Sequence, residues 1–226
     1  MQRLMVFGDS IMKGVVWSEE RGRHTMLPGA ERTLNTTLRS SGVEIENYAK
    51  FGADAETTLR VVTRHLDGLR AEDTVLLGFG GNDCAYNWDA VSADPEGAHA
   101  PNTPPEKLEE LFTSCIAKVK QAGCRVLAAN LVPIDAEKYF SWITRGRDRD
   151  AILRWLGDVS MLYRWHESYC ELVSTVCRRE GVEPVDLRRP FLLRHDYKAL
   201  ICADGMHPTP MGYALLDSVI AGRVLE

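Results

Sequence analysis

Three residues whose types suit acyl transfer stand near opposite ends of the chain: Ser10, and Asp204 with His207 three residues later. A serine hydroxyl is a weak nucleophile until a neighbouring imidazole takes its proton. His207 can take that proton near neutral pH, and Asp204 can hold the imidazole in the required tautomer. The alternative is that Ser10, or Asp9 before it, only caps a following helix. The sequence therefore contains the parts of a catalytic triad, provided that the fold brings the two ends together.

Three hydrogen-bond donors suited to a developing oxyanion are also present. They are the backbone N–H groups of Ser10 and Gly52 and the side-chain amide of Asn82. Preorganised donors stabilise the charge of a tetrahedral intermediate, and losing one typically costs ~3–4 kcal/mol. Asn82 and Asp83 could instead form only a turn. We expect Asp83 to be structural and to hold loops together.

Apolar runs predict the strands that position these residues. Runs that are apolar almost throughout are typical of strands buried on both faces of a parallel sheet. Ser10, Gly52 and Asn82 each follow one of the first three runs, and α/β folds bind ligands at the carboxyl edge of the strands. The expected strands span residues 3–7, 43–49, 74–79, 124–132 and 182–187.

Amphipathic segments between the strands predict helices on both faces of the sheet, so we expect an α/β fold with residues 1–226 as a single domain. Three long connections, residues 11–27, 84–103 and 133–149, leave the edge that carries Ser10. Long loops are uncommon unless they are functional. The expected helices span residues 28–41, 55–69, 104–122, 150–180 and 210–224, with a short helix plus loop in residues 190–201.

Four motifs give the chain a resemblance to the SGNH hydrolases, also called GDSL esterases and lipases. They are Gly8-Asp9-Ser10, Gly52, Gly80-Gly81-Asn82-Asp83 and Asp204-Gly205-Met206-His207, in the family's order. The resemblance implies a flavodoxin-like three-layer α/β/α sandwich with a five-stranded parallel sheet. It implies Ser10 as nucleophile, His207 as base and Asp204 as orienting acid, with oxyanion donors from Ser10, Gly52 and Asn82. The leucine of the GDSL name is Ile11 here, a mild change that leaves the interpretation intact.

Side chains near the same edge are candidates for substrate contacts. Aromatic faces suit sugar rings, and arginines suit carboxylates or phosphates. The alternative is that the aromatics pack onto the domain while the arginines stay in solvent. No long apolar acyl groove is evident in these connections, which favours a short acyl group on a polar carrier such as an acetylated sugar. The candidates are Asp9, Trp17, Trp88, Tyr139, Trp142 and Arg145.

The remaining histidines and the cysteines have no predicted chemical role. His166 lies on the apolar stripe of the expected helix 150–180 and is predicted to be a hydrogen-bonded core residue. The six cysteines lack the close pairs that bind zinc, and several fall on apolar helical faces. Histidines in polar stretches, predicted to face solvent, are His24, His65, His99 and His195; cysteines predicted to pack in the core are Cys115, Cys170 and Cys177.

Composition and charge argue against a nucleic-acid-binding protein and against a membrane-spanning one. The net charge of −5 does not suggest a nucleic-acid partner. No apolar run approaches the ~20 residues of a membrane span. Because no signal peptide is visible and the cysteines read as reduced, a cytoplasmic protein is expected.

We therefore expect a serine esterase that needs no metal or cofactor, forms an acyl-serine intermediate and removes short acyl groups from a small polar substrate. The sequence does not set its oligomeric state. A thioesterase or lysophospholipase on the same site is an alternative, as is a catalytically silent binding protein. A hydrolase with a metal on Asp9, Asp83, Asp204 and His207 is a third, but it leaves Ser10 unexplained.

Overall fold

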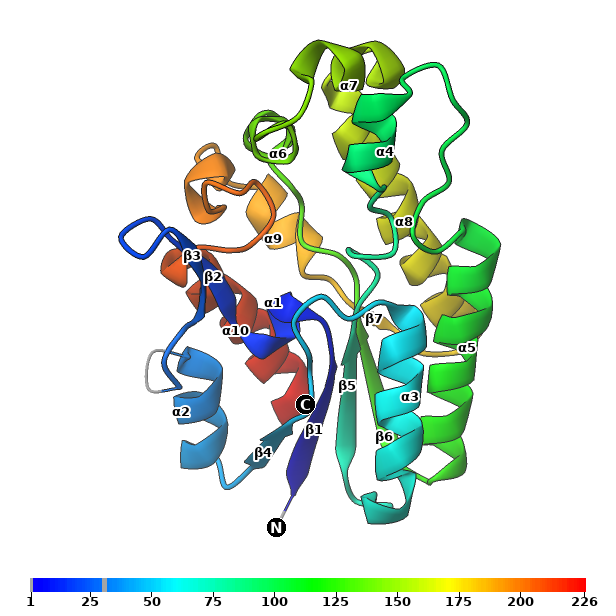
Figure 1. Ribbon diagram of the computed structural model, residues 1–226. Coiled ribbons are helices and arrows are strands. Elements are labelled where there is room, and N and C mark those ends of the chain that lie inside the picture. The colour runs from blue at the N-terminus through cyan, green and yellow to red at the C-terminus, as the bar shows by residue number, and fades with distance from the viewer. Residues whose placement is uncertain (1, 30–31) are drawn as a thin grey trace.

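A parallel sheet of five strands lies at the centre of the computed structural model, which describes residues 2–29 and 32–226 (Figure 1). The strand order is β4-β1-β5-β6-β7. Counted along the chain within this sheet, that is the 2-1-3-4-5 order of flavodoxin-like folds, so the expected fold class is confirmed. The strands are β1 (Arg3–Gly8), β4 (Glu44–Asn47), β5 (Thr74–Gly78), β6 (Arg125–Ala129) and β7 (Pro184–Val185).

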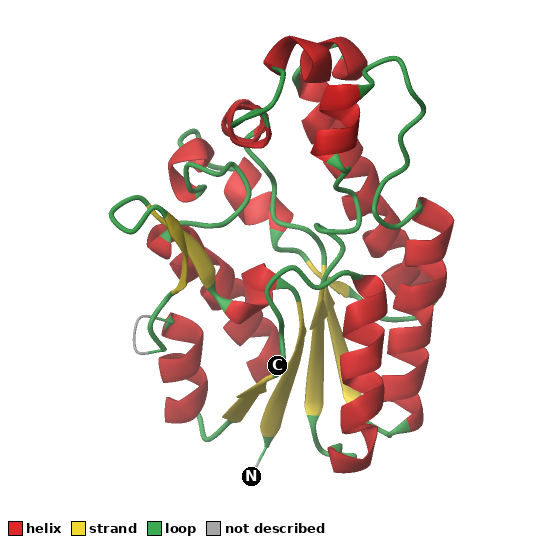
Figure 2. Ribbon diagram, viewed as in Figure 1, coloured by secondary structure: helices red, strands yellow, loops and turns green. Residues whose placement is uncertain are grey.

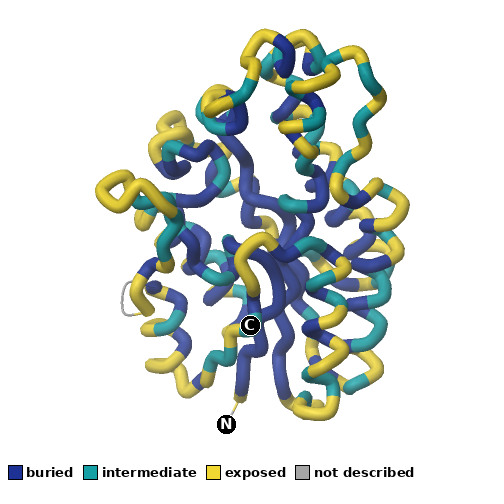
Figure 3. Tube along the Cα trace, viewed as in Figure 1, coloured by how far each residue is buried: buried dark blue, intermediate teal, exposed yellow. Residues whose placement is uncertain are grey.

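Helices cover both faces of the sheet (Figure 2). One face packs against α2 and α10, and the other against α3, α5 and α8. Every residue of β1 and β5 is buried because both faces of these strands are covered, as Figure 3 shows. The helices are α2 (Thr33–Ser40), α3 (Ala55–His65), α5 (Pro105–Gln121), α8 (Ser160–Arg179) and α10 (Pro210–Leu225). Residues 30–31, at the start of the expected helix 28–41, lie outside the described residues.

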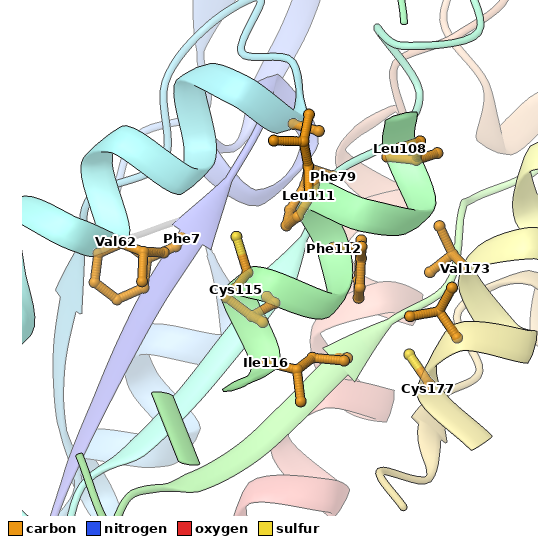
Figure 4. Packing of buried hydrophobic residues seen from close by; sticks show 14 of the residues in the cluster. Phe7, Val62, Phe79, Leu108, Leu111, Phe112, Cys115, Ile116, Val173 and Cys177 are labelled. Carbon is orange, nitrogen blue, oxygen red and sulfur yellow. The ribbon is translucent and has the colours of Figure 1, made fainter. Parts of the chain in front are cut away.

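The larger apolar cluster joins the sheet to α3, α5 and α8. Phe7 of β1, Phe112 of α5 and Val173 of α8 all contribute fully buried side chains to it (Figure 4). The cysteines predicted to lie in the core are confirmed there, at positions 115, 170 and 177. Burial makes these thiols inert: it raises the pKa of Cys177 to about 12.

The three long connections are not structureless, and here the expected loops are wrong. Residues 11–27 form most of α1 (Ser10–Lys13) and a hairpin of β2 (Val15–Ser18) and β3 (Arg23–Met26). Residues 84–103 contain α4 (Trp88–Ala93), and residues 133–149 contain α6 (Ala136–Ile143).

The expected helix 150–180 is two helices. Gly157, with φ +77°, ends α7 (Arg149–Leu156), and α8 begins at Ser160. An L side chain is strained in that left-handed conformation, so the glycine lets the chain turn where the apolar periodicity continues. In the segment after β7, α9 (Arg188–Leu192) and a 3₁₀ turn (Tyr197–Leu200) confirm the expected short helix plus loop.

The helices α4, α6 and α7 and the first turns of α8, here called the cap, stand above the carboxyl edge of the sheet (Figure 1). They share their own apolar cluster, which includes Trp88, Phe140, Ile152 and Leu162. The cap therefore gives the carboxyl edge an apolar wall that the sheet alone would lack. Among the described residues, no helix combines the length and the apolar character needed to cross a membrane.

Candidate active site

Ser10 is the first residue of α1, and only Asp9 separates it from the end of β1. Gly8 pairs with Gly78 across β1 and β5, and a Cβ on Gly8 would lie 2.0 Å from the Gly78 carbonyl oxygen. Only glycine permits this approach, which brings the chain into its turn. The Asp9 carboxylate then accepts the Ile11 N–H at 2.9 Å and caps α1. Ser10 thus lies at the boundary between β1 and β5, where flavodoxin-like sheets bind ligands.

A continuous chain of hydrogen bonds joins Ser10 to the other end of the sequence. The Ser10 Oγ lies 2.9 Å from His207 Nε2, and His207 Nδ1 lies 2.6 Å from Asp204 Oδ2. All three side chains are buried, Asp204 completely. The structure therefore brings together the three residues that the sequence placed almost 200 positions apart.

The loop that carries Asp204 and His207 is held against the cap. Gly205 has φ +78°, and a Cβ there would lie 2.2 Å from the Tyr139 backbone nitrogen of α6. Its carbonyl accepts the Asp135 N–H at 2.9 Å. A further backbone bond from Cys202 to the His207 carbonyl closes the loop at 2.8 Å. Gly205 is therefore required by both conformation and space.

The electrostatics of Asp204 favour its ionised form. Burial alone would raise the pKa of this carboxyl, but the hydrogen bond from His207 and the backbone N–H groups of Met206 and His207 bring it down to about 2. Both N–H groups donate to Oδ1 at 3.0 Å. Asp204 is therefore a carboxylate that only accepts hydrogen bonds. The neighbouring Asp9 differs: burial raises the pKa of its carboxyl to about 6.

Asn82 faces the same pocket as Ser10 and His207. Its Nδ2 donates to the Ala53 carbonyl at 2.9 Å, which leaves the second N–H of the amide free for another acceptor. Gly52, with φ +69°, lies in the exposed turn just before Ala53. Asp83 has the structural role expected of it, since its Oδ1 accepts the N–H of Ala55 at the start of α3 at 2.9 Å.

An apolar pocket of about 70 Å³ opens beside Ser10, Asn82 and His207. Its wall comes from the cap and from the segment that follows Asn82. The sequence did not point to most of these residues: Leu162, Trp165 and His166 lie on a face of α8 that reads as ordinary core, and Tyr86 and Ile134 lie in connections without a motif. The wall includes Tyr86, Trp88, Ile134, Tyr139, Leu162, Trp165 and His166.

The six candidate substrate contacts fall into two groups. Asp9, Trp88 and Tyr139 line the pocket, although the Asp9 carboxylate is also occupied in capping α1. Trp17 and Trp142 lie on the side of the β2–β3 hairpin, in edge-to-face contact with ring centroids 4.5 Å apart. The exposed Arg145 guanidinium stacks 4.2 Å above the Trp142 ring. The second group therefore lies outside the pocket beside Ser10.

His24, His65 and His99 are half-buried, so the prediction that they face solvent was wrong for these three. His99 Nε2 lies 2.8 Å from the Asp94 carbonyl oxygen. His24 Nε2 lies 2.9 Å from Asp204 Oδ2, because the β2–β3 hairpin folds back over the loop that carries Asp204 and His207. The His65 ring packs against Tyr48 with centroids 4.0 Å apart, and its Nδ1 contacts the Val61 carbonyl at 2.8 Å. Their polar sequence surroundings did not reveal these tertiary contacts.

His166 is buried as expected, but its Nδ1 has no hydrogen-bond partner among the described residues. The prediction of a satisfied core histidine was therefore wrong in that respect. Burial lowers the pKa of His166 to about 3, so the ring is neutral at physiological pH. This leaves a neutral imidazole in the otherwise largely apolar wall of the pocket.

Within residues 2–29 and 32–226, the region around Asp204 and His207 also holds the one cluster whose atoms lie close enough to bind a metal ion. Atoms of His24, Asp204 and His207 lie within 4.8 Å of one another. Neither Asp9 nor Asp83 belongs to this cluster. The same atoms are already joined by hydrogen bonds, so the arrangement is satisfied by protons alone.

Comparison with known proteins agrees with this geometry. The profile of the GDSL-like Lipase/Acylhydrolase family matches residues 6–215. The chain belongs to this family. As a member of this family, the chain is a hydrolase of the esterase or lipase type. No curated protein sequence matches the chain.

Solved structures share the fold of this GDSL-like protein over nearly its whole length. A lipase/acylhydrolase from Enterococcus faecalis has a TM-score of 0.69 at 17% identity, with 99% of this chain and 95% of that chain covered. A G-D-S-L lipolytic protein from Veillonella parvula has a TM-score of 0.67 at 14% identity, covering 98% and 97%. Est24, a carbohydrate acetylesterase from Sinorhizobium meliloti, has a TM-score of 0.66 at 15% identity, covering 100% and 99%. At these identities the likeness concerns the fold alone.

Proposed function

We propose that Ser10, His207 and Asp204 are the catalytic triad of a carboxylic-ester hydrolase that acts through an acyl-serine intermediate. The observation that carries this proposal is the chain of hydrogen bonds from Ser10 Oγ through His207 to Asp204. It has the order and the atoms that a serine nucleophile, its base and an orienting acid require.

In the first step, His207 Nε2 takes the Ser10 proton while Oγ attacks the ester carbonyl carbon. The resulting oxyanion accepts hydrogen bonds from the backbone N–H groups of Ser10 and Gly52 and from the free N–H of Asn82. The C–O bond to the alcohol then breaks, and His207 gives its proton to the leaving oxygen. Water repeats the sequence on the acyl-serine, releasing the acid and restoring Ser10.

The pocket supports a short acyl group. A cavity of about 150 Å³ holds a benzene molecule, so the pocket of about 70 Å³ beside Ser10 suits an acyl chain of only a few carbons. Trp17 and Trp142, which lie together outside this pocket, offer aromatic surface for a sugar or another small polar alcohol. We therefore propose acetylated carbohydrates or similar small esters as substrates; the carbohydrate acetylesterase activity named for Est24 is in line with this choice.

The test is a rate profile on p-nitrophenyl esters from acetate to decanoate, together with acetylated sugars and an acyl thioester. We expect kcat/KM to be highest for acetate to butyrate and Ser10→Ala to remove activity. A profile that rises to long chains or favours the thioester would support the lysophospholipase or thioesterase alternative. Failure of Ser10 to react with a fluorophosphonate would support the silent binding protein.

Leu162→Ala tests the assignment of the pocket to the acyl group. Leu162 lies in the pocket wall, and its truncation should shift the preferred chain length upward by a few carbons. Leu156→Ala is the matched control, because Leu156 belongs to the same apolar cluster but not to the wall. Equal shifts in the two variants would assign the effect to loosened packing and would reject this use of the pocket.

A further inference from the structure

His24 is held beside the triad by the β2–β3 hairpin. It pairs with Trp17 across the two strands, so the two rings lie on one face of the hairpin, with centroids 5.1 Å apart. Trp142 of α6 and Phe51 of the turn after β4 contact the same imidazole, at 5.6 Å and 5.4 Å between centroids. Three rings from three elements thus fix the direction in which His24 points, and its side chain is only 22% exposed.

The contact that this packing produces is with the acid of the triad. Asp204 Oδ1 accepts two backbone N–H groups, and Oδ2 faces two imidazoles, His207 at 2.6 Å and His24 at 2.9 Å. An ionised carboxylate has room for about four hydrogen bonds and can only accept them. His24 Nε2 must therefore carry a proton and donate. With His24 in place, all four positions of the Asp204 carboxylate are occupied.

We propose that His24 is a positioning residue of the esterase: in its neutral Nε2–H form it holds the Asp204 carboxylate toward His207, and its protonation opposes catalysis. The proposal rests on the triad proposed above. It goes further because it makes activity depend on a second histidine that does not contact the nucleophile.

Charge explains why the neutral form is the productive one. When His207 takes the Ser10 proton it becomes an imidazolium, and the His24 ring centre lies 4.8 Å from the His207 ring centre. A proton on His24 would place a like charge at that distance and would draw the Asp204 carboxylate away from His207. Two titratable groups face His24 from the loop after the 3₁₀ turn, namely Asp204 and His207. The segment after α6 adds the charge of Arg145, which stacks over Trp142. Trp17, Trp142 and Phe51 themselves carry no charge.

The experiment compares two replacements of His24 in the full chain. His24→Gln keeps a side-chain N–H donor but cannot titrate, and His24→Phe keeps the aromatic ring but has no donor. His195→Gln, on an exposed loop, is the control for losing a histidine. The measurements are kcat and KM for p-nitrophenyl acetate from pH 5 to 9, with thermal melting to confirm the fold.

Because two histidines must be neutral, the logarithm of kcat/KM for the wild type should fall with a slope approaching about two on the acid side. In His24→Gln the slope should be about one. His24→Phe should also have a slope of about one, with its plateau kcat lowered about tenfold and KM nearly unchanged. His24→Gln should recover most of that loss. The proposal would be overturned if kcat/KM of both His24 variants fell on the acid side as it does in the wild type. It would also be overturned if His24→Gln and His24→Phe lost the same fraction of kcat.

Proton NMR gives a readout that needs no substrate. The proton shared by His207 Nδ1 and Asp204 Oδ2 should give a downfield resonance. It should move in His24→Phe and stay near its wild-type position in His24→Gln and His195→Gln. An unmoved resonance in His24→Phe would overturn the positioning role even if the esterase substrate had been wrongly chosen. Activity that survives Ser10→Ala would instead count against the triad.

Discussion

Replacing Asp204 by asparagine should stop catalysis through the tautomer of His207 rather than through loss of structure. Asparagine has one acceptor oxygen and one NH₂ group, so its two ends are no longer equivalent. The Met206 and His207 N–H groups on the Oδ1 side both require an acceptor, at 3.0 Å. The NH₂ group must then face His207 Nδ1. That nitrogen becomes an acceptor, the ring proton moves to Nε2, and Nε2 can no longer take the proton of Ser10.

The size of the effect follows from the cost of turning the amide over. The reversed orientation would leave two buried backbone N–H groups facing an NH₂ group, at roughly 2 kcal/mol each. About 4 kcal/mol corresponds to a population near one in a thousand. The reversed amide also lacks the charge that stabilises the imidazolium, so we expect kcat to fall by about 10³–10⁴ with little change in KM.

The assay is kcat and KM of Asp204→Asn on p-nitrophenyl acetate, with nitrogen NMR of the His207 ring to identify the protonated atom. Asp196→Asn, at an exposed aspartate, is the control. The wild type should carry the proton on Nδ1 and the variant on Nε2. A variant that keeps more than about a hundredth of the wild-type kcat, or keeps the proton on Nδ1, would refute the reasoning.

Three further substitutions test the donor and the buried titratable groups. Asn82→Ala should lower kcat by ~10²–10³ at nearly constant KM if Asn82 donates to the oxyanion. The control Asn35→Ala, on α2, should leave kcat unchanged. A rise in KM alone would mean that Asn82 binds the substrate in the ground state. Burial raises the pKa of Asp9 to about 6. As pH rises from about 4 to above 6, the free energy of unfolding of the wild type should therefore fall by roughly 3 kcal/mol relative to that of Asp9→Asn, measured by denaturant unfolding. A difference between the two proteins that does not change with pH would contradict this. Burial lowers the pKa of His166 to about 3. As pH falls from about 7.5 to 4, the free energy of unfolding of the wild type should therefore fall by roughly 3 kcal/mol relative to that of His166→Leu. If the two free energies of unfolding change in parallel with pH, the ring is not held neutral by burial.

The five strands of the parallel sheet in their chain order, and the edge that carries Ser10 and Asn82, follow from the sequence alone. Each depends on local rules: apolar runs of strand length, helical periodicity, and motifs placed directly after strands. Because parallel strands end at one edge, Ser10 and Asn82 could be assigned to a common site without knowing any contact. The motif with Asp204 and His207 supplied the other two residues of the proposed triad by its type and spacing.

Only the tertiary structure decided what surrounds Ser10, His207 and Asp204. The break at Gly157 was hidden because apolar periodicity continues from α7 into α8, although a left-handed glycine turns the chain there. The pocket wall was hidden because Leu162 and Trp165 face it from positions that periodicity assigns equally well to a core. His24 was assigned to solvent because its neighbours in sequence are polar, whereas its partners come from an α6 tryptophan, the turn after β4 and the loop of Asp204. Contacts between segments so distant in sequence leave no local pattern, and the packing of the whole chain determines them.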